Sequence, residues 1–138
     1  MKKILVVEDD RKLSTALGIR LKAAGYEVLQ AFDGLEGFKL ATRCRPDLVV
    51  MDVWMPGEIG FLTAQRLKHV GLSGVPVIFL TAGKRDDLWG IAEELEPAGF
   101  FEKPYDSQQL LNAISLALEG VHFSPTHPTP PSGGYERL

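Results

Sequence analysis

Three carboxylates, a hydroxyl and an ammonium stand at the ends of short hydrophobic runs in this sequence. They are the pair Glu8-Asp9 after residues 4–7, Asp52 after 48–51, Thr81 after 77–80, and Lys103 after 100–102. In an open parallel sheet the carboxyl ends of the strands lie side by side, so such residues meet in one crevice. Three anionic groups there repel one another unless a cation lies among them. Oxygen ligands in this number suit Mg²⁺, which leaves room for phosphate oxygens. The pattern predicts phosphoryl chemistry.

The elements that would position these residues alternate along the chain. Apolar runs at about 4–7, 26–31, 48–51, 76–80 and 98–102 are separated by segments of helical periodicity, at about 11–24, 34–43, 59–70, 85–95 and 107–120. Asp10, Asp33 and Asp106 are the expected N-caps of the first, second and last helices. Five βα units predict an α/β fold, a doubly wound, five-stranded parallel sheet with helices on both faces.

Length and composition limit the classes of protein. With 138 residues, 45% of them hydrophobic, the chain fits one domain. The net charge of −3 comes without a basic stripe, which disfavours direct nucleic acid binding. Cys44 is the only cysteine, so a cytoplasmic setting is expected, and no apolar run is long enough for a membrane span. The sequence after residue 120 is rich in proline and glycine, so we expect a folded domain over 1–120 and a flexible tail or linker over 121–138.

Charge and nucleophilicity assign roles to the strand-end residues. A carboxylate can attack phosphorus to form an acyl phosphate, and Asp52 is the candidate because it is separate from the acidic pair. Glu8 and Asp9 would hold the metal. The Lys103 ammonium would neutralise charge on the phosphoryl oxygens, and Thr81 could donate a hydrogen bond to one of them.

Each of these residues has a simpler interpretation when it is taken alone. Acids are favoured in the first turn of a helix, Asp52 could be a turn residue, Thr81 could bond the local backbone, and Lys103 could be a solvated lysine. The hypothesis therefore depends on the four strand ends together.

Four segments carry a resemblance to a known family. They are residues 4–10 (ILVVEDD), 50–57 (VMDVWMPG), 80–82 (LTA) and 100–104 (FFEKP). In this order they resemble the receiver domain of bacterial two-component response regulators, over about residues 3–120. The resemblance implies a flavodoxin-like (βα)5 fold with strand order 2-1-3-4-5.

The resemblance also implies site residues and partners. Asp52 is expected to accept a phosphoryl group from a histidine kinase or a histidine phosphotransfer protein. Glu8, Asp9, Asp52 and the backbone carbonyl of Trp54 match the Mg²⁺ site, and Lys103 is expected to pair with Asp52. The Lys103-Pro104 bond is expected to be cis.

In that family a threonine moves toward the phosphate and an aromatic residue swings inward, which alters a distant surface. Thr81 and Phe100 occupy these positions. Phosphorylation is expected to change the surface of the fourth helix, fifth strand and fifth helix. Phe100 has no hydroxyl, so it can respond only by packing.

The two tryptophans leave alternatives open. Trp54, two residues after the acceptor, either shields the acyl phosphate from water or packs against a neighbouring helix. Trp89 belongs either to a partner-binding surface or to the core, and core packing is the favoured interpretation.

The leading hypothesis is a phosphorelay signalling module that acts on a downstream protein or on an output domain. It is not an enzyme beyond catalysing its own phosphorylation and dephosphorylation. Phosphorylation-dependent homodimerisation stays open. The rival is a small Mg²⁺-dependent phosphohydrolase with an aspartyl nucleophile, but the order of the acidic groups is reversed relative to the haloacid dehalogenase superfamily.

Overall fold

A computed structural model of the chain describes residues 1–55, 57–83 and 85–120. The described residues form a central sheet of five parallel strands in the order β2-β1-β3-β6-β7. The strands are β1 (Lys3–Val7), β2 (Glu27–Ala31), β3 (Leu48–Asp52), β6 (Val77–Thr81) and β7 (Gly99–Glu102). Counted without the small hairpin β4–β5, this is the predicted order 2-1-3-4-5. The doubly wound α/β fold is confirmed.

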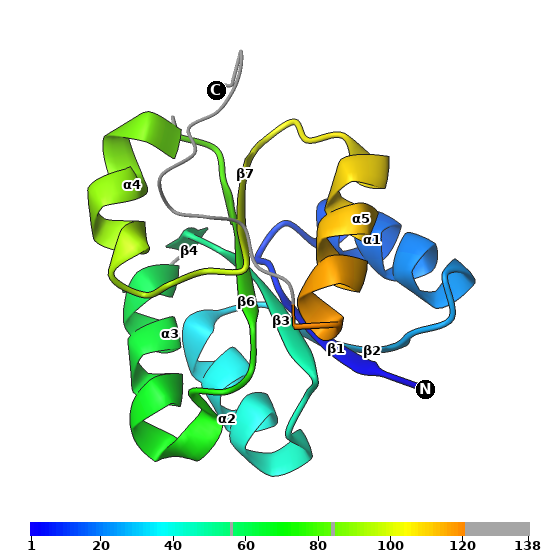
Figure 1. Cartoon of the computed structure of the whole chain (residues 1–138), viewed down its shortest axis with the longest axis horizontal. Helices are drawn as coiled ribbons and strands as arrows, with labels where there is room; N and C mark the ends of the chain where they lie inside the picture. Colours follow the sequence, from blue (N-terminus) through cyan, green and yellow to red (C-terminus); the bar gives the residue numbers. More distant parts are fainter. Residues whose placement is uncertain (56, 84, 121–138) are drawn as a thin grey trace.

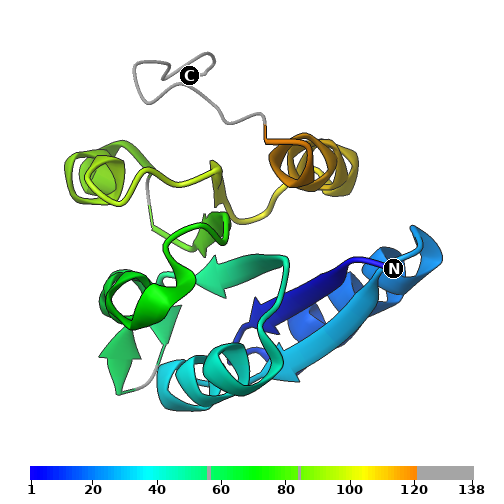
Figure 2. The same ribbon diagram turned by 60° about the horizontal axis from the view of Figure 1, so that its bottom comes forward.

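Helices cover both faces of the sheet (Figure 1). On one face lie α1 (Arg11–Ala23) and α5 (Ser107–Leu118), and on the other lie α2 (Gly34–Cys44), α3 (Gly60–Leu67) and α4 (Arg85–Glu93). Successive strand residues alternate between the two layers: Ile4 and Val6 belong to the apolar cluster on the α1 and α5 face, whereas Leu5 and Val7 belong to the cluster on the face covered by α2, α3 and α4. Figures 1 and 2 show α4 and α5 on opposite sides of β7.

The predicted N-caps are confirmed. Asp10 accepts from the amides of Lys12 and Leu13, and Asp33 and Asp106 cap α2 and α5 in the same way. These bonds satisfy amides that have no partner within the helix. The caps fix where each helix starts and therefore how far it lies from the preceding strand. The Lys103-Pro104 peptide bond is cis, as expected.

The third helix ends earlier than predicted. The periodic pattern predicted a helix to about residue 70, but α3 ends at Leu67 and is followed by a wide turn of π-helical type, η1 (Lys68–Leu72). Gly71 has a φ of 87° inside this turn, a conformation that cannot continue a right-handed helix. The fourth helix also ends about two residues early, at Glu93.

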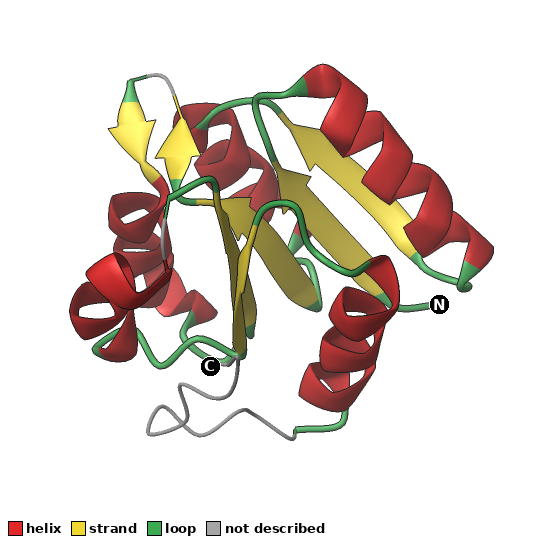
Figure 3. Ribbon diagram, turned by 90° about the horizontal axis from the view of Figure 1, so that it is seen from above, coloured by secondary structure: helices red, strands yellow, loops and turns green. Residues whose placement is uncertain are grey.

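A two-stranded antiparallel hairpin was not predicted. It consists of β4 (Trp54–Met55) and β5 (Glu58–Ile59), and it follows β3 directly, beside the carboxyl edge of the main sheet (Figure 3). Gly57 turns the hairpin with a φ of 84°. The hairpin places Trp54 next to the last residue of β3.

The predicted flexible tail, residues 121–138, lies outside the described residues. Among the helices that the structure describes, none is long and apolar enough to cross a membrane.

Candidate functional site

The carboxyl edge of the sheet gathers the strand-end residues. Glu8 directly follows β1, Asp52 and Thr81 are the last residues of β3 and β6, and Lys103 directly follows β7. The parallel register places Val7 opposite Met51, Asp52 opposite Leu80, and Thr81 opposite Glu102, so the four ends lie at one level. One carboxylate oxygen from each of Glu8, Asp9 and Asp52 lies within 4.8 Å of the others. Backbone topology alone therefore brings the acids together.

The carboxylates are buried and share one ammonium. Glu8 is 1% exposed and Asp52 is 3% exposed, whereas Asp9 is exposed. Lys103 Nζ lies 2.7 Å from Glu8 Oε1 and 3.3 Å from Asp52 Oδ2. The other oxygens bond the backbone: the Asp10 amide donates to Glu8 Oε2 and the Trp54 amide donates to Asp52 Oδ1. Three carboxylates and one ammonium leave an excess of negative charge at a largely buried site.

The excess of negative charge and the burial of the site shift the pKa values of Asp52 and Lys103. Burial, followed by the charge of Glu8, raises the pKa of Asp52 to about 7, although Lys103 opposes the shift. Burial alone would lower the pKa of Lys103, but its contacts with Glu8 and Asp52 outweigh burial and raise that pKa. The ionised form of Asp52 is therefore disfavoured in the folded chain. A second cation near Asp52 would favour its ionisation.

The donor set fits Mg²⁺. Glu8 Oε1 is buried, and no donor among the described residues makes a well-directed hydrogen bond to it, although Lys103 Nζ is close. An oxygen in this situation, beside two further carboxylate oxygens, offers the hard ligands that Mg²⁺ prefers. The backbone amide of Trp54 donates a hydrogen bond to the Asp52 carboxylate. The role of the Trp54 carbonyl as a ligand stays a prediction.

Thr81 is fully buried at the end of β6. Its Oγ1 accepts a hydrogen bond from the amide of Gly83 at 2.9 Å, which is the local backbone bond that its simpler interpretation predicted. Its carbonyl accepts from the amide of Lys103 at 2.7 Å. Because a hydroxyl both accepts and donates, the Thr81 proton is still available to another acceptor.

The two tryptophans differ in their environment. Trp89 packs against Phe100 with a centroid distance of 6.0 Å and is partly buried, so the core-packing interpretation holds for it. Trp54 is 49% exposed, and its indole lies over Gly83: a Cβ built on Gly83 would be 3.3 Å from Trp54 Nε1. The Trp54 indole therefore borders the β6–α4 loop beside Thr81.

Two glycines and a tyrosine near the site were given no site role from the sequence. A Cβ on Gly60 would collide with the carbonyl oxygen of Asp52, so only glycine lets α3 begin so close to the end of β3. Gly83 leaves the space that the Trp54 indole fills. Burial and the charge of Glu8 raise the pKa of Tyr105, which places this ring within the field of the site. The signal available in the sequence was that each of these residues follows shortly after the end of a strand.

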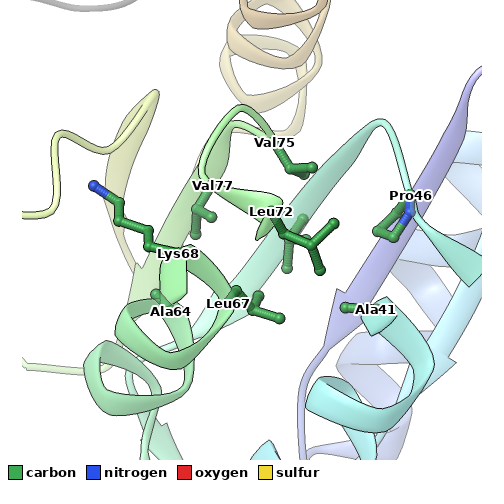
Figure 4. A pocket seen from close by; sticks show the side chains of 9 residues that line it. Ala41, Pro46, Ala64, Leu67, Lys68, Leu72, Val75 and Val77 are labelled. Atoms are coloured by element: carbon green, nitrogen blue, oxygen red, sulfur yellow. The ribbon is translucent and has the colours of Figure 1, made fainter. Parts of the chain in front are cut away.

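A separate hollow lies between α2 and α3 at the amino ends of β3 and β6 (Figure 4). Its lining is almost entirely apolar: Ala41, Pro46, Val49, Ala64, Leu67, Lys68, Leu72, Val75 and Val77. The strands separate it from the carboxylates, which lie at the opposite edge of the sheet. It therefore cannot hold a substrate over Asp52.

The fold and the site together define a class: parallel α/β domains with a metal-fitting acidic crevice at the carboxyl edge of the sheet. The family model of the response regulator receiver domain matches residues 4–115. The chain belongs to this family. Receiver domains are signalling modules of two-component systems and are generally dependent on Mg²⁺. Membership implies interaction with a kinase or a phosphotransfer protein.

Known proteins agree with this assignment. The chain is 36% identical over 123 residues to protein PilH of Pseudomonas aeruginosa, covering 87% of this chain and all of PilH. It is 32% identical over 116 residues to sporulation initiation phosphotransferase F of Bacillus subtilis, covering 84% and 93%. A putative response regulator from Chloroflexus aurantiacus has a TM-score of 0.79 at 28% identity, with 86% and 98% covered.

Other relatives are longer. The match to the DNA-binding dual master transcriptional regulator RpaA of Synechocystis is 35% identical over 121 residues and covers 86% of this chain but 49% of that protein. The chain thus spans about half the length of several curated relatives that it matches.

Proposed function

We propose that this chain is a phosphorelay module in which Asp52 accepts a phosphoryl group with the aid of Mg²⁺. The observation that carries the proposal is the contact of one ammonium, Lys103, with both Glu8 and Asp52 beside a third carboxylate. The donor would be a phosphohistidine of a kinase or of a phosphotransfer protein. The cytoplasmic setting expected from the sequence stays a prediction.

In the proposed transfer, a carboxylate oxygen of Asp52 attacks phosphorus, the donor's N–P bond breaks, and its electron pair returns to the imidazole. The product is an acyl phosphate on Asp52. Lys103 would move from the carboxylate to a phosphoryl oxygen, and the Thr81 hydroxyl would donate to another. Mg²⁺, held by Glu8, Asp9 and Asp52, would supply further neutralisation of charge when it is bound.

The output would be a change in the surface formed by α4, β7 and α5. Thr81 supports this proposal because its Oγ1 holds the amide of Gly83, so a movement of Thr81 toward phosphate would pull on the loop that starts α4. A downstream protein, or an output domain, would read the altered surface. Phosphorylation-dependent homodimerisation through it is a further form that this output could take.

Intact mass spectrometry after incubation with acetyl phosphate tests the acceptor. We expect one phosphoryl adduct that requires Mg²⁺ and is lost in Asp52→Asn. Asp33→Asn is the matched control, because asparagine caps a helix about as well as aspartate and Asp33 caps α2. An adduct that persists in Asp52→Asn, or that forms equally in EDTA, would refute the proposal.

The same samples distinguish the rival. A phosphohydrolase would turn over a general phosphate ester such as p-nitrophenyl phosphate, with release of inorganic phosphate far in excess of protein. We expect no such turnover, because the family match favours a signalling module.

A further inference from the structure

Four aromatic rings from four different elements pack together one layer below the acidic crevice. Phe61 of α3 meets Phe79 of β6 edge to face at 4.9 Å, and Phe100 of β7 lies 6.2 Å from Phe61 and 6.0 Å from Phe79. Trp89 of α4 covers Phe100 at 6.0 Å with an interplanar angle of 31°. We call these four rings the aromatic cluster.

The aromatic cluster is joined to the site from two sides. Phe61 directly follows Gly60, which touches the Asp52 carbonyl and donates its amide to the Val53 carbonyl at 2.7 Å. On the other side, Phe79 is two residues before Thr81, so both side chains point to the same face of the sheet. Asp52 and Thr81 are therefore each linked to the aromatic cluster, one through Gly60 and Phe61 and the other through β6.

Within the cluster, Phe100 is the ring with the most ring neighbours. It is 5% exposed and has three ring neighbours, and its register partner across β7 and β6 is Phe79. Swinging this ring out would expose its area to water and open a cavity bounded by the other three rings. Burial of a phenylalanine side chain disfavours such a state by roughly tenfold to a hundredfold, before the ring contacts are counted.

Trp89 is placed differently. Its indole is only partly buried and contacts Phe100. It is carried by α4, which follows the loop whose Gly83 amide donates to Thr81 Oγ1. The contact between Trp89 and Phe100 is tilted at 31°, whereas the three contacts among the phenylalanine rings are edge to face.

We propose that Phe100 is a fixed inward ring in this protein and that the conformational signal is carried by movement of Trp89, with α4, across it. This inference rests on the proposed function, because it names the moving part of the proposed switch. It departs from the expectation that the aromatic residue of β7 is the part that swings.

Two spectroscopic probes test the inference. Trp89 becomes the only tryptophan in a Trp54→Phe background, because the chain has two. The chain has seven phenylalanines, and uniform 4-fluorophenylalanine labelling gives each a ¹⁹F signal, with that of Phe100 assigned by its loss in Phe100→Leu. Phe32, partly exposed under Arg11, is the reference for a ring that senses solvent. Adduct formation is measured by intact mass in each sample.

When the adduct forms, we expect one Phe100 signal without an H₂O/D₂O isotope shift in both forms, and a change in Trp89 emission. A Phe100 signal that becomes solvent-sensitive or splits in either form overturns the inference, and so does an unchanged Trp89 emission. If no adduct forms on the native chain either, the proposed function has failed separately. A solvent-sensitive Phe100 signal in the unmodified chain then still overturns the fixed ring, and a solvent-insensitive one supports it.

Discussion

Replacing Asp52 by asparagine should stabilise the metal-free protein above about pH 4, by an amount that grows up to about pH 7. Asp52 has a folded pKa of about 7 against an ordinary value of 3.8, because burial and Glu8 disfavour its charge. Between these two values the folded chain retains a proton that the unfolded chain loses. The folded state therefore binds more protons, and its stability falls as pH rises from about 4 to about 7. Asparagine does not titrate, so Asp52→Asn lacks this loss.

The size of the effect follows from the shift. A displacement of about three pKa units corresponds to roughly 4 kcal/mol at full ionisation, as each unit is worth about 1.4 kcal/mol. Relaxation of Lys103 toward Asp52 reduces this figure, and we expect about 2–4 kcal/mol. Below about pH 4 Asp52 is largely protonated in both the folded and the unfolded chain and is neutral like asparagine, so the two chains should differ least there. The difference should grow as pH rises from about 4, where the unfolded chain ionises first, and should level off above about pH 7.

Urea unfolding followed by circular dichroism, in EDTA, measures the free energy of unfolding of both chains at pH 5, 6, 7 and 8. Other titrating groups are common to both chains and cancel in the difference. Asp33→Asn, an equivalent change at a helix cap, should show no such pH-dependent difference. A difference between Asp52→Asn and the native chain that stays constant within about 0.5 kcal/mol from pH 5 to pH 8 would refute the electrostatic account.

A divalent cation should offset part of the loss of folding stability that the ionised Asp52 causes. Mg²⁺ at ten times its dissociation constant stabilises the folded state by about 1.4 kcal/mol, because it binds only the assembled carboxylates. The native chain at pH 8 should gain this amount, and Asp52→Asn should gain less, since it has lost one of the three carboxylates.

Three further changes test other contacts at the site. Lys103→Met removes the only ammonium that contacts Glu8 and Asp52 among the described residues. We expect a loss of phosphoryl adduct, and a free energy of unfolding roughly 3–5 kcal/mol lower at pH 8 in EDTA that Mg²⁺ partly restores. Unchanged adduct formation would contradict this. Trp54→Asn should shorten the lifetime of the adduct, measured by mass after removal of donor, because the indole beside Thr81 is removed; an equal or longer lifetime would show that Trp54 does not shield. Gly60→Ala should lower stability by about 1–3 kcal/mol and slow adduct formation, since a Cβ there displaces the Asp52 carbonyl; native rates and stability would contradict the close approach.

Much of the fold could be predicted because the patterns were local. Asp10, Asp33 and Asp106 cap the helices that they precede, and the apolar runs became the five parallel strands. The convergence of Glu8, Asp52, Thr81 and Lys103 needed one further step, since parallel strands place their carboxyl ends at one edge.

What was missed depends on contacts between segments. The β4–β5 hairpin has two-residue strands, which are too short to show a period. The end of α3 was hidden by apolar residues that continue the helical spacing through η1, where the positive φ of Gly71 ends it. The approach of the Trp54 indole to Gly83 joins two loops, and no spacing in the sequence determines such a distance. The depth of burial of Asp52, which sets its pKa, likewise exists only in the folded chain.

The same charge excess that lowers the stability of the metal-free site explains why the site can act as a switch. Three carboxylates and Lys103 leave two formal negative charges, which one Mg²⁺ would balance. Phosphorylation of Asp52 would replace a single carboxylate charge by a phosphoryl group carrying up to two, so even a metal-loaded site would lack about one positive charge. Neutral donors must then stabilise the added oxygens. The hydroxyl of Thr81 has a proton to offer, and its oxygen already holds the amide of Gly83 at the start of the loop to α4. The proposed switch thus follows from charge: the residue that could supply the missing hydrogen bond is also the one that holds the loop leading to α4.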